Sequence, residues 1–491
     1  MLLVSNGTEL ITQLIFLFPV KSSLFPLSTS EFNFFQLLIK GFLRFVSNLC
    51  YEQVINKEQD SMNTKTTTKK HNQMSQYSVT EPVPIPTKQS LEQPSFFQSH
   101  QLLPTIDSIA TGTPNKVIRQ SDAADFIAQL PQLTENQSRI GKIYNNTRIE
   151  TRHLAIDLLS EEGMVLTASD NPIQSRMELY KEYAIPLAEK VAKKALAAAA
   201  ASVDNNNSLH SKLNIEDSIR LIVFVSSTGF IAPGVDTELI KKLGLRPNTA
   251  RVTVNFMGCA AAMNGLRVAC DHVRAYPSDK VLLVCLELSS VNAVFANDIN
   301  DVIIHSIFSD GCAAVVIGAC EQEQAIAQGK LVIKDHLSYL VENTEDGIVL
   351  SIQDNGITCQ LSRQLPDYIK NGVGSIIEGF LASHSLTKDS IDLWAIHPGG
   401  TRIIENAQNS LGLTDNQVAD SWEILREYGN MLSPSVLFVM ERMLLRCQDS
   451  QTTNNLNHQS QDASEKNKAL TGIAFSFAPG VGVEGILFQK L

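Results

Sequence analysis

The chain has 491 residues, enough for two or three average domains or for one large layered domain. Hydrophobic residues make up 44% and charged residues 19%, with no excess of Gly or Pro, which excludes collagen-like and wholly disordered chains. The formal net charge of −11 argues against a nucleic-acid partner, although it leaves room for a local basic groove that binds phosphates.

The first hundred residues differ in composition from the rest of the chain. The apolar run at 10–18 is too short to span a bilayer and has no basic residue before it, so we expect no stable membrane span and only a poorly formed signal peptide. Residues 56–100 are rich in Thr, Gln, Lys and Ser, which is typical of disorder. We therefore predict that residues 1–101 are a leader or disordered extension, in which 1–61 are a gene-model artefact or a targeting segment.

From about residue 103, apolar segments alternate with helical periodicity to the end of the chain. Polar islands at 202–214 and 448–468 interrupt this pattern and are predicted to be surface insertions. The predicted strands are 219–226, 251–256, 280–286, 313–318, 393–397, 473–477 and 483–488, and the predicted helices are 237–243, 260–276, 401–411 and 431–445. Since strands alternate with helices and several strands are apolar on both faces, the pattern indicates a layered α/β fold.

The eight cysteines include none in a C-x-x-C pair, so no metal site is predicted. Several lie in apolar runs, such as Cys285 in 281–285, and this placement is typical of small buried residues in a reducing compartment. We therefore expect a cytoplasmic protein.

Cys259 differs from the other cysteines in its surroundings. A strand with β-branched residues ends just before it, Gly258 provides a sharp turn, and three alanines follow. The pattern predicts that Cys259 begins a helix, whose unpaired N–H groups and positive dipole end stabilise a thiolate and lower the pKa of the thiol. Cys259 is thus a candidate nucleophile, which requires a base and donors for an oxyanion.

Two further segments offer such groups. His397 ends an apolar strand and is followed by Pro398, Gly399 and Gly400, and glycines let a backbone approach a ligand closely. Asn430 lies just before a predicted helix. Taken singly, His397 is equally compatible with a packed residue at a strand end, and Asn430 with a helix N-cap.

Together, the segments around Cys259, His397 and Asn430 resemble the active-site motifs of type III polyketide synthases, the chalcone-synthase-like family. Further stretches are similar to family segments in the same order along the chain: 146–154 to the N-terminal segment, 243–247 to LGLRP, 308–314 to FGDGAAA and 475–480 to the terminal GFGPG loop. The resemblance implies a thiolase fold of two stacked, similar α/β halves in one layered domain. Residues 102–320 would hold the nucleophile, residues 321–491 would hold the histidine and asparagine, and a homodimer would be the working unit.

The resemblance also implies roles for single residues. Cys259 would carry the starter acyl group and the growing chain, while His397 and Asn430 would donate hydrogen bonds to the malonyl thioester carbonyl and stabilise the enolate that forms when carbon dioxide leaves. Phe308 would gate the space between the sulfur and the cavity. The implied reaction is iterative decarboxylative condensation of malonyl-CoA onto an acyl-CoA starter, giving a pyrone- or resorcinol-type polyketide. CoA thioesters would be the substrates, and no cofactor is implied.

Residues that bind CoA are implied in the same way. Arg139 and Lys142 fall where the family keeps cations for the CoA phosphates, and Asn146 stands where the family often has lysine. Gly399 and Gly400 would leave room for the pantetheine arm.

The implied cavity wall consists of Ser227, Asn292, Leu350, Cys359, Leu432 and Pro479. Leu350 and Leu432 stand where chalcone synthases have Gly and Ser, and their isobutyl groups would fill the cavity. Cys359 stands where they have phenylalanine and would open space, while Ala232 stands where plant members have a methionine that reaches the partner's cavity. These departures predict a tri- or tetraketide pyrone rather than a chalcone.

Three other activities stay open. A ketoacyl synthase III-like condensing enzyme also uses Cys, His and Asn, but such enzymes usually have Thr-Ser where Met431 and Leu432 stand here. A hydroxymethylglutaryl-CoA synthase needs a catalytic glutamate, for which no motif lies near Cys259. A non-catalytic CoA-binding relative is disfavoured by the intact set of Cys259, His397 and Asn430.

Overall fold

The structure is a computed structural model that describes residues 102–168, 171–204, 214–295, 298–457 and 469–491. The predicted leader lies outside the described residues, as do most of the two predicted insertions, at 205–213 and 458–468. None of the described helices is long and apolar enough to cross a bilayer.

Nine strands form one mixed sheet in the order β11-β12-β13-β8-β1-β7-β6-β4-β5, and two further two-stranded sheets pair β2 with β3 and β9 with β10. The strands are β1 (Leu102–Gly112), β2 (Lys116–Arg119), β3 (Thr151–Leu154), β4 (Ile219–Ser226), β5 (Ala250–Asn255), β6 (Lys280–Leu288), β7 (Asp310–Glu321), β8 (Leu331–Leu340), β9 (Ile348–Gln353), β10 (Gly356–Leu361), β11 (Leu393–Ile396), β12 (Leu470–Ala478) and β13 (Gly482–Lys490).

The large sheet consists of two halves with the same pattern of pairing. In the first half β4 pairs with β6 in parallel, and β6–β7 and β7–β1 are antiparallel. In the second half β11 pairs with β12 in parallel, and β12–β13 and β13–β8 are antiparallel. Within the sheet, the two halves are joined where Thr105 and Ile106 of β1 pair with Val332 and Leu331 of β8. This repetition confirms the predicted α/β fold with two similar halves.

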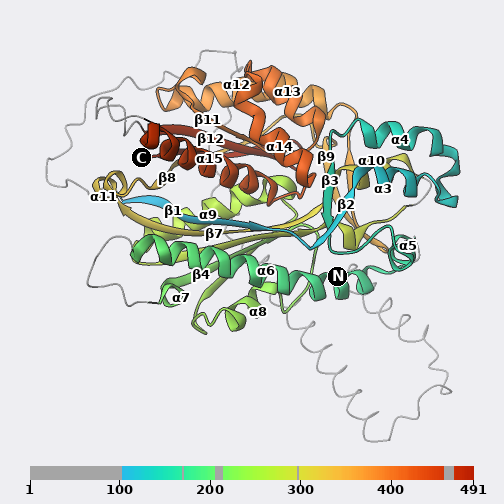
Figure 1. The fold of residues 1–491 in the computed structure, drawn as a ribbon, viewed down its shortest axis with the longest axis horizontal. Coiled ribbons are helices and arrows are strands. Elements are labelled where there is room, and N and C mark those ends of the chain that lie inside the picture. The colour runs from blue at the N-terminus through green and yellow to red at the C-terminus, as the bar shows by residue number, and fades with distance from the viewer. Residues whose placement is uncertain (1–101, 169–170, 205–213, 296–297, 458–468) are drawn as a thin grey trace, which may run out of the picture. The chain divides into compact units, whose positions relative to one another are not determined.

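The helices are α3 (Gln120–Ile127), α4 (Gln137–Asn145), α5 (Glu161–Thr167), α6 (Ile173–Asp204), α7 (Ile215–Ser218), α8 (Val235–Lys242), α9 (Ala261–Ala275), α10 (Ile299–Ile307), α11 (Gln322–Ala327), α12 (Leu365–Ser383), α13 (Thr401–Leu411), α14 (Ala419–Tyr428) and α15 (Ser435–Asn457). They form layers because strands such as β6 are apolar on both faces and must be covered on both. Helices α9 and α15 pack between the two half-sheets, α6 and α8 cover the outer face of the first half, and α12, α13 and α14 cover that of the second (Figure 1).

The approach of α9 to the sheet depends on one small residue. A Cβ atom at Gly265 would lie 2.6 Å from the Leu283 Cδ1 atom of β6, closer than two carbon atoms can pack. Glycine at this position therefore lets α9 sit directly on the first half-sheet, and this placement sets where the chain just before α9 must lie.

Two boundaries close to the predicted site differ from those expected. Cys259 lies in a single 3₁₀ turn, Gly258–Ala260, and α9 begins only at Ala261, so the cysteine precedes the helix rather than starting it. Helix α15 begins at Ser435 instead of at 431, because Leu432 has a left-handed φ of +58° that a helix cannot include.

Candidate active site

Three separate segments carry the predicted catalytic side chains; the Cys259 and Asn430 side chains face each other, and the His397 ring lies against Gly399, whose carbonyl the Asn430 amide contacts. Cys259 follows β5, His397 follows β11, and Asn430 lies between α14 and α15. The Asn430 amide faces the sulfur, with Nδ2 at 3.9 Å and Oδ1 at 4.0 Å from the Cys259 Sγ atom. Asn430 Nδ2 also donates a hydrogen bond to the Gly399 carbonyl at 3.1 Å, which ties it to the loop that follows His397.

The orientation of the Asn430 amide is fixed by its neighbours. Its Oδ1 atom accepts a hydrogen bond from the Leu432 N–H at 2.8 Å, so the Nδ2 group is the part free to donate toward the sulfur. Its backbone N–H donates to the Ile307 carbonyl at 3.0 Å and its carbonyl accepts from the Ser309 N–H at 2.9 Å. The Asn430 backbone therefore bridges to that of Phe308, and these two residues hold a fixed register.

The turn that carries Cys259 is held from both sides. Gly258 has a φ of +55°, its N–H donates to Ser227 Oγ at 3.0 Å, and the Cys259 carbonyl accepts from Ser476 Oγ at 2.7 Å. A Cβ atom at Gly258 would lie 3.4 Å from Pro479 and 3.6 Å from Leu350, so these two side chains close over the turn. Glycine is needed there for its left-handed conformation.

The acid–base properties of Cys259 and His397 differ from those expected from the sequence. Cys259 keeps part of its surface accessible, yet desolvation raises the pKa of its thiol above the ordinary value instead of lowering it. Desolvation lowers the pKa of the buried His397 imidazole to about 3. The surroundings of both groups therefore favour the neutral forms, and burial outweighs the attraction of the nearby helix end.

The His397 ring is open to an incoming group. Within the described part of the chain neither ring nitrogen makes a hydrogen bond, although the residue is 1% exposed. Buried polar atoms are nearly always satisfied in folded proteins. A ring nitrogen that lacks a partner is therefore suited to bind a substrate oxygen.

Apolar side chains pack against Cys259, and several of them also line a neighbouring cavity of about 40 Å³, whose wall contains both polar and apolar residues. The predicted residues that line it are Ser227, Asn292, Phe308, Leu350, Cys359 and Leu432. Pro479 lies outside this cavity, against Gly258. The structure therefore brings all but one of the predicted wall residues to the same cavity as the predicted gate.

The predicted CoA cations lie apart from the sulfur. Arg139 and Lys142 are exposed on α4, three residues apart and so on one face of the helix. Asn146 follows at the end of this helix, where its carbonyl accepts a hydrogen bond from Thr401 Oγ1 at 3.0 Å. Because Thr401 follows Gly400, the end of α4 lies beside the glycine loop that follows His397.

Glu287, which was not predicted from the sequence, is a buried carboxylate beside this site. Its carboxylate oxygens accept hydrogen bonds from Ser433 Oγ at 2.6 Å, from the Ser227 N–H at 2.9 Å and from Thr228 Oγ1 at 2.8 Å. Desolvation raises the pKa of Glu287 to about 7. The available signal was a single acidic residue inside the apolar run of β6.

Comparisons with known proteins identify the family of the chain. Residues 94–321 match the family model "Chalcone and stilbene synthases, N-terminal domain", and residues 333–491 match the corresponding C-terminal domain. The chain is 47% identical over 384 residues to "Alpha-pyrone synthesis polyketide synthase-like Pks18" of Mycobacterium tuberculosis, covering 78% of this chain and 90% of the relative. It is 33% identical over 370 residues to polyketide synthase 37 of Dictyostelium discoideum, covering 75% of this chain and 12% of that longer relative.

Solved structures give the same result. PKS-I from the brown alga Ectocarpus siliculosus matches with a TM-score of 0.72 and 41% identity, over 80% of this chain and all of the other. The C-terminal type III polyketide synthase domain of Steely1, a type I/III hybrid from Dictyostelium, matches with a TM-score of 0.66 and 26% identity, over 79% of this chain and 99% of the domain. The chain therefore belongs to the family of chalcone and stilbene synthases and is a type III polyketide synthase, a CoA-dependent acyltransferase.

Proposed function

We propose that this enzyme builds an α-pyrone by condensing malonyl-CoA repeatedly onto an acyl-CoA starter held on Cys259. The sulfur attacks the starter thioester carbonyl, a carbon–sulfur bond forms, and free CoA leaves. Malonyl-CoA then loses carbon dioxide to give an enolate, whose carbon attacks the acyl group and releases the Cys259 sulfur. The lengthened chain, now on CoA, returns to the sulfur for the next round.

The observation that carries this proposal is the oriented Asn430 amide. Its Oδ1 atom is engaged by the Leu432 N–H, which leaves Nδ2 pointing at the space beside the Cys259 sulfur, 3.9 Å away. The unpartnered His397 ring, which lies against Gly399 and hence next to the Asn430 amide, would be the second donor. Two fixed donors suit the thioester oxygen of an enolate, and removing one such donor typically costs about 10²–10³ in rate.

The pyrone product follows from the last step and from the relatives. A tri- or tetraketide can close when an enol oxygen attacks the thioester carbon, which forms the lactone ring and expels the thiol. The similarity to an α-pyrone synthesis enzyme supports this outcome. The small volume of the cavity beside Phe308 supports a short chain.

Further roles belong to the same proposal. Arg139 and Lys142 would bind CoA phosphates, and Gly399 and Gly400 would flank the pantetheine arm, because the end of α4 lies beside this glycine loop. Residues 102–320 and 321–491 would form the two halves of the enzyme. The cytoplasm is the proposed compartment, in keeping with the described cysteines, all of which are free thiols.

A homodimer is proposed from the exposed edge of the large sheet. Strand β5 is the last strand of the sheet and exposes Val252 at 37%, while Phe230 nearby is 59% exposed. Phe230 lines a hollow of about 910 Å³ together with Ala232 and with Arg251 and Thr253 of β5. An unpaired edge with apolar side chains favours pairing with a second copy. A solution mass of one chain by light scattering would contradict the dimer.

Radiolabelled malonyl-CoA incubated with the protein and a panel of acyl-CoA starters tests the proposed function. We expect labelled carbon dioxide and labelled triketide or tetraketide pyrones with at least one starter. Decarboxylation without any carbon–carbon bond formation, or chain transfer only to an acyl carrier protein, would contradict it.

A further inference from the structure

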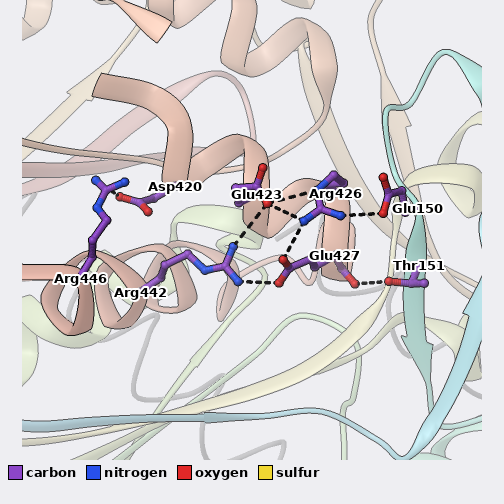
Figure 2. Close-up of polar contacts among 8 residues, drawn as sticks. All are labelled: Glu150, Thr151, Asp420, Glu423, Arg426, Glu427, Arg442 and Arg446. Carbon is purple, nitrogen blue, oxygen red and sulfur yellow. Dashed lines mark hydrogen bonds and ion pairs between the residues drawn. The ribbon is translucent and has the colours of Figure 1, made fainter. Parts of the chain in front are cut away.

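Strand β3 runs between the two loops that carry Phe308 and Asn430. On one side the Glu150 N–H donates to the Arg426 carbonyl at 2.8 Å, and Thr151 Oγ1 donates to the Glu427 carbonyl at 2.6 Å (Figure 2). On the other side the His153 N–H donates to Ser309 Oγ at 3.0 Å. The segment 150–153 is thus bonded to the chain before Asn430 and to the chain after Phe308.

Ion pairs reinforce the first of these attachments. Arg426 of α14 pairs with Glu150 at 2.6 Å and with Glu427 at 2.9 Å, and Arg442 of α15 pairs with Glu427 at 2.5 Å (Figure 2). These side chains are partly exposed, so each pair contributes little alone. Together they join Glu427, three residues before Asn430 near the end of α14, to the start of β3 and to α15.

Arg152 is the buried centre of this segment. It is 2% exposed, and its Nε donates to Gln120 Oε1 at 2.9 Å. Its Nη1 donates to the His305 carbonyl at 2.6 Å and to the Phe308 carbonyl at 3.0 Å. The planar guanidinium therefore fixes both ends of the last turn of α10, which leads into Phe308.

The stem of the same side chain meets the other loop. A Cβ atom at Gly429 would lie 3.1 Å from Arg152 Cγ and 3.3 Å from Cδ, so the arginine chain lies against the residue before Asn430. One side chain thus contacts Phe308 and the residue next to Asn430, the two residues that form the backbone bridge being Phe308 and Asn430. Lysine has one ammonium in place of the planar fork and cannot reproduce these bonds together.

We propose that Arg152 is a positioning residue for decarboxylation, which sets the Asn430 amide and the Phe308 ring at the distance from Cys259 that enolate formation requires. This inference rests on the roles proposed above for Phe308 and Asn430. Arg152 itself does not touch the sulfur. It acts through the backbone register of the two loops, in which a displacement of 1 Å can cost about 100-fold in rate.

Arg152→Lys separates this role from a general loss of structure. We expect its kcat for malonyl-CoA decarboxylation to fall by about 10- to 100-fold, with KM changed by less than about threefold. Acylation of Cys259 by a starter acyl-CoA, measured by intact-protein mass spectrometry in one turnover, should stay within about twofold of the parent, because Arg152 bonds nothing in the turn that carries the sulfur.

Arg176→Lys is the matched control. Arg176 is equally buried and donates to the backbone carbonyls of Leu166, Val291 and Ala293, none of which belongs to the Phe308 or Asn430 loop. We expect this variant to lose thermal stability as Arg152→Lys does, while the ratio of decarboxylation to acylation stays at the parent value.

Gln120→Met is the second variant should Arg152→Lys fail to fold. It removes the acceptor of the Arg152 Nε–H and the two bonds that Gln120 Nε2 donates to Thr147 Oγ1 and the Ser306 carbonyl, but it keeps the Arg152 bonds to the His305 and Phe308 carbonyls. We expect a fall of about three- to tenfold in decarboxylation, again with acylation retained. Parental decarboxylation in the folded variants, or an equal loss of decarboxylation and acylation, would overturn the inference. A parent enzyme that acylates Cys259 but never decarboxylates malonyl-CoA would instead refute the proposed function.

Discussion

Single residues around the sulfur have their chemistry set by burial more than by neighbouring charges. Desolvation raises the pKa of Cys259, lowers that of His397 to about 3 and raises that of Glu287 to about 7. A neutral imidazole can accept the thiol proton as the sulfur attacks and can donate afterwards to an enolate oxygen. In the proposed mechanism, His397 would thereby serve both acyl transfer and decarboxylation.

Cys259→Ala separates these two steps. The variant should form no polyketide, because no atom remains to hold the starter, and it should keep some malonyl-CoA decarboxylation because His397 and Asn430 remain. Carbon dioxide release and product formation, measured on the same sample, check this. Product formation equal to that of the parent would remove Cys259 as the nucleophile.

Glu287 should make stability depend on pH. Its pKa rises from 4.5 to about 7 on folding, so the native state holds a proton that the unfolded chain has already lost, and its contribution to stability falls as pH rises from 4.5 to 7. The Glu287→Gln variant lacks this pH-dependent contribution to stability. The free energy of unfolding of the variant minus that of the parent, from urea titrations, should increase by about 3 kcal/mol between pH 4.5 and pH 8. A difference that does not change with pH would contradict the raised pKa of Glu287.

The residues that could be predicted are those that end an element. Cys259, His397 and Asn430 each follow or precede a regular segment next to glycine, and together they match family motifs. Glu287 and Arg152 could not be selected, because their partners are distant in sequence: Ser433 lies 146 residues from Glu287, and Phe308 lies 156 residues from Arg152. Local pattern carries no information about such contacts.

At the scale of elements, the pair β9–β10 determines the cavity wall. Leu350 of β9 pairs directly with Cys359 of β10, so the added isobutyl group and the space left by the missing phenyl ring lie side by side. The resemblance implied that Leu350 fills space and that Cys359 opens it. If so, volume has moved from one strand to its neighbour. This two-stranded sheet was absent from the predicted elements.

Leu350→Gly should lengthen the products by at least one acetate unit, because a chain stops growing when it meets the wall and Leu350 lines the cavity. Ile352→Gly is the matched control on the same strand, since Ile352 is 51% exposed and lies outside the cavity. Liquid chromatography with mass spectrometry of the pyrones checks this. An unchanged distribution in Leu350→Gly, or the same shift in the control, would show that Leu350 does not limit the chain.

Regular strands and helices were predicted well where periodicity alone decides. Strand β4 and helix α13 begin and end as expected. Two errors fall at the active site, at the 3₁₀ turn of Cys259 and at the start of α15, where left-handed residues interrupt the regular backbone. Strands β1 and β8 and helices α6 and α12 were not predicted at all. Such residues are set by tertiary contacts, which propensity does not report.

At the scale of the whole molecule, catalysis should need only the part that matches the family. A chain starting at residue 101 should fold and turn over with the kcat of the full protein, because the composition of residues 1–100 is unsuited to a packed core. The thermal midpoint and pyrone formation of both forms check this. If the shorter chain is insoluble or inactive while the full chain works, the leader is structural.

The two half-sheets meet at the pairs between β1 and β8, and the active site draws Cys259 from the first half and His397 and Asn430 from the second. The proposed mechanism requires these three residues to act on one acyl chain. Tandem mass spectrometry of proteolysed enzyme, quenched after incubation with a starter acyl-CoA, tests it most directly. We expect the acyl mass on the peptide that contains Cys259, followed by added two-carbon units when malonyl-CoA is supplied. Acylation of Cys359 or of another residue instead would contradict it.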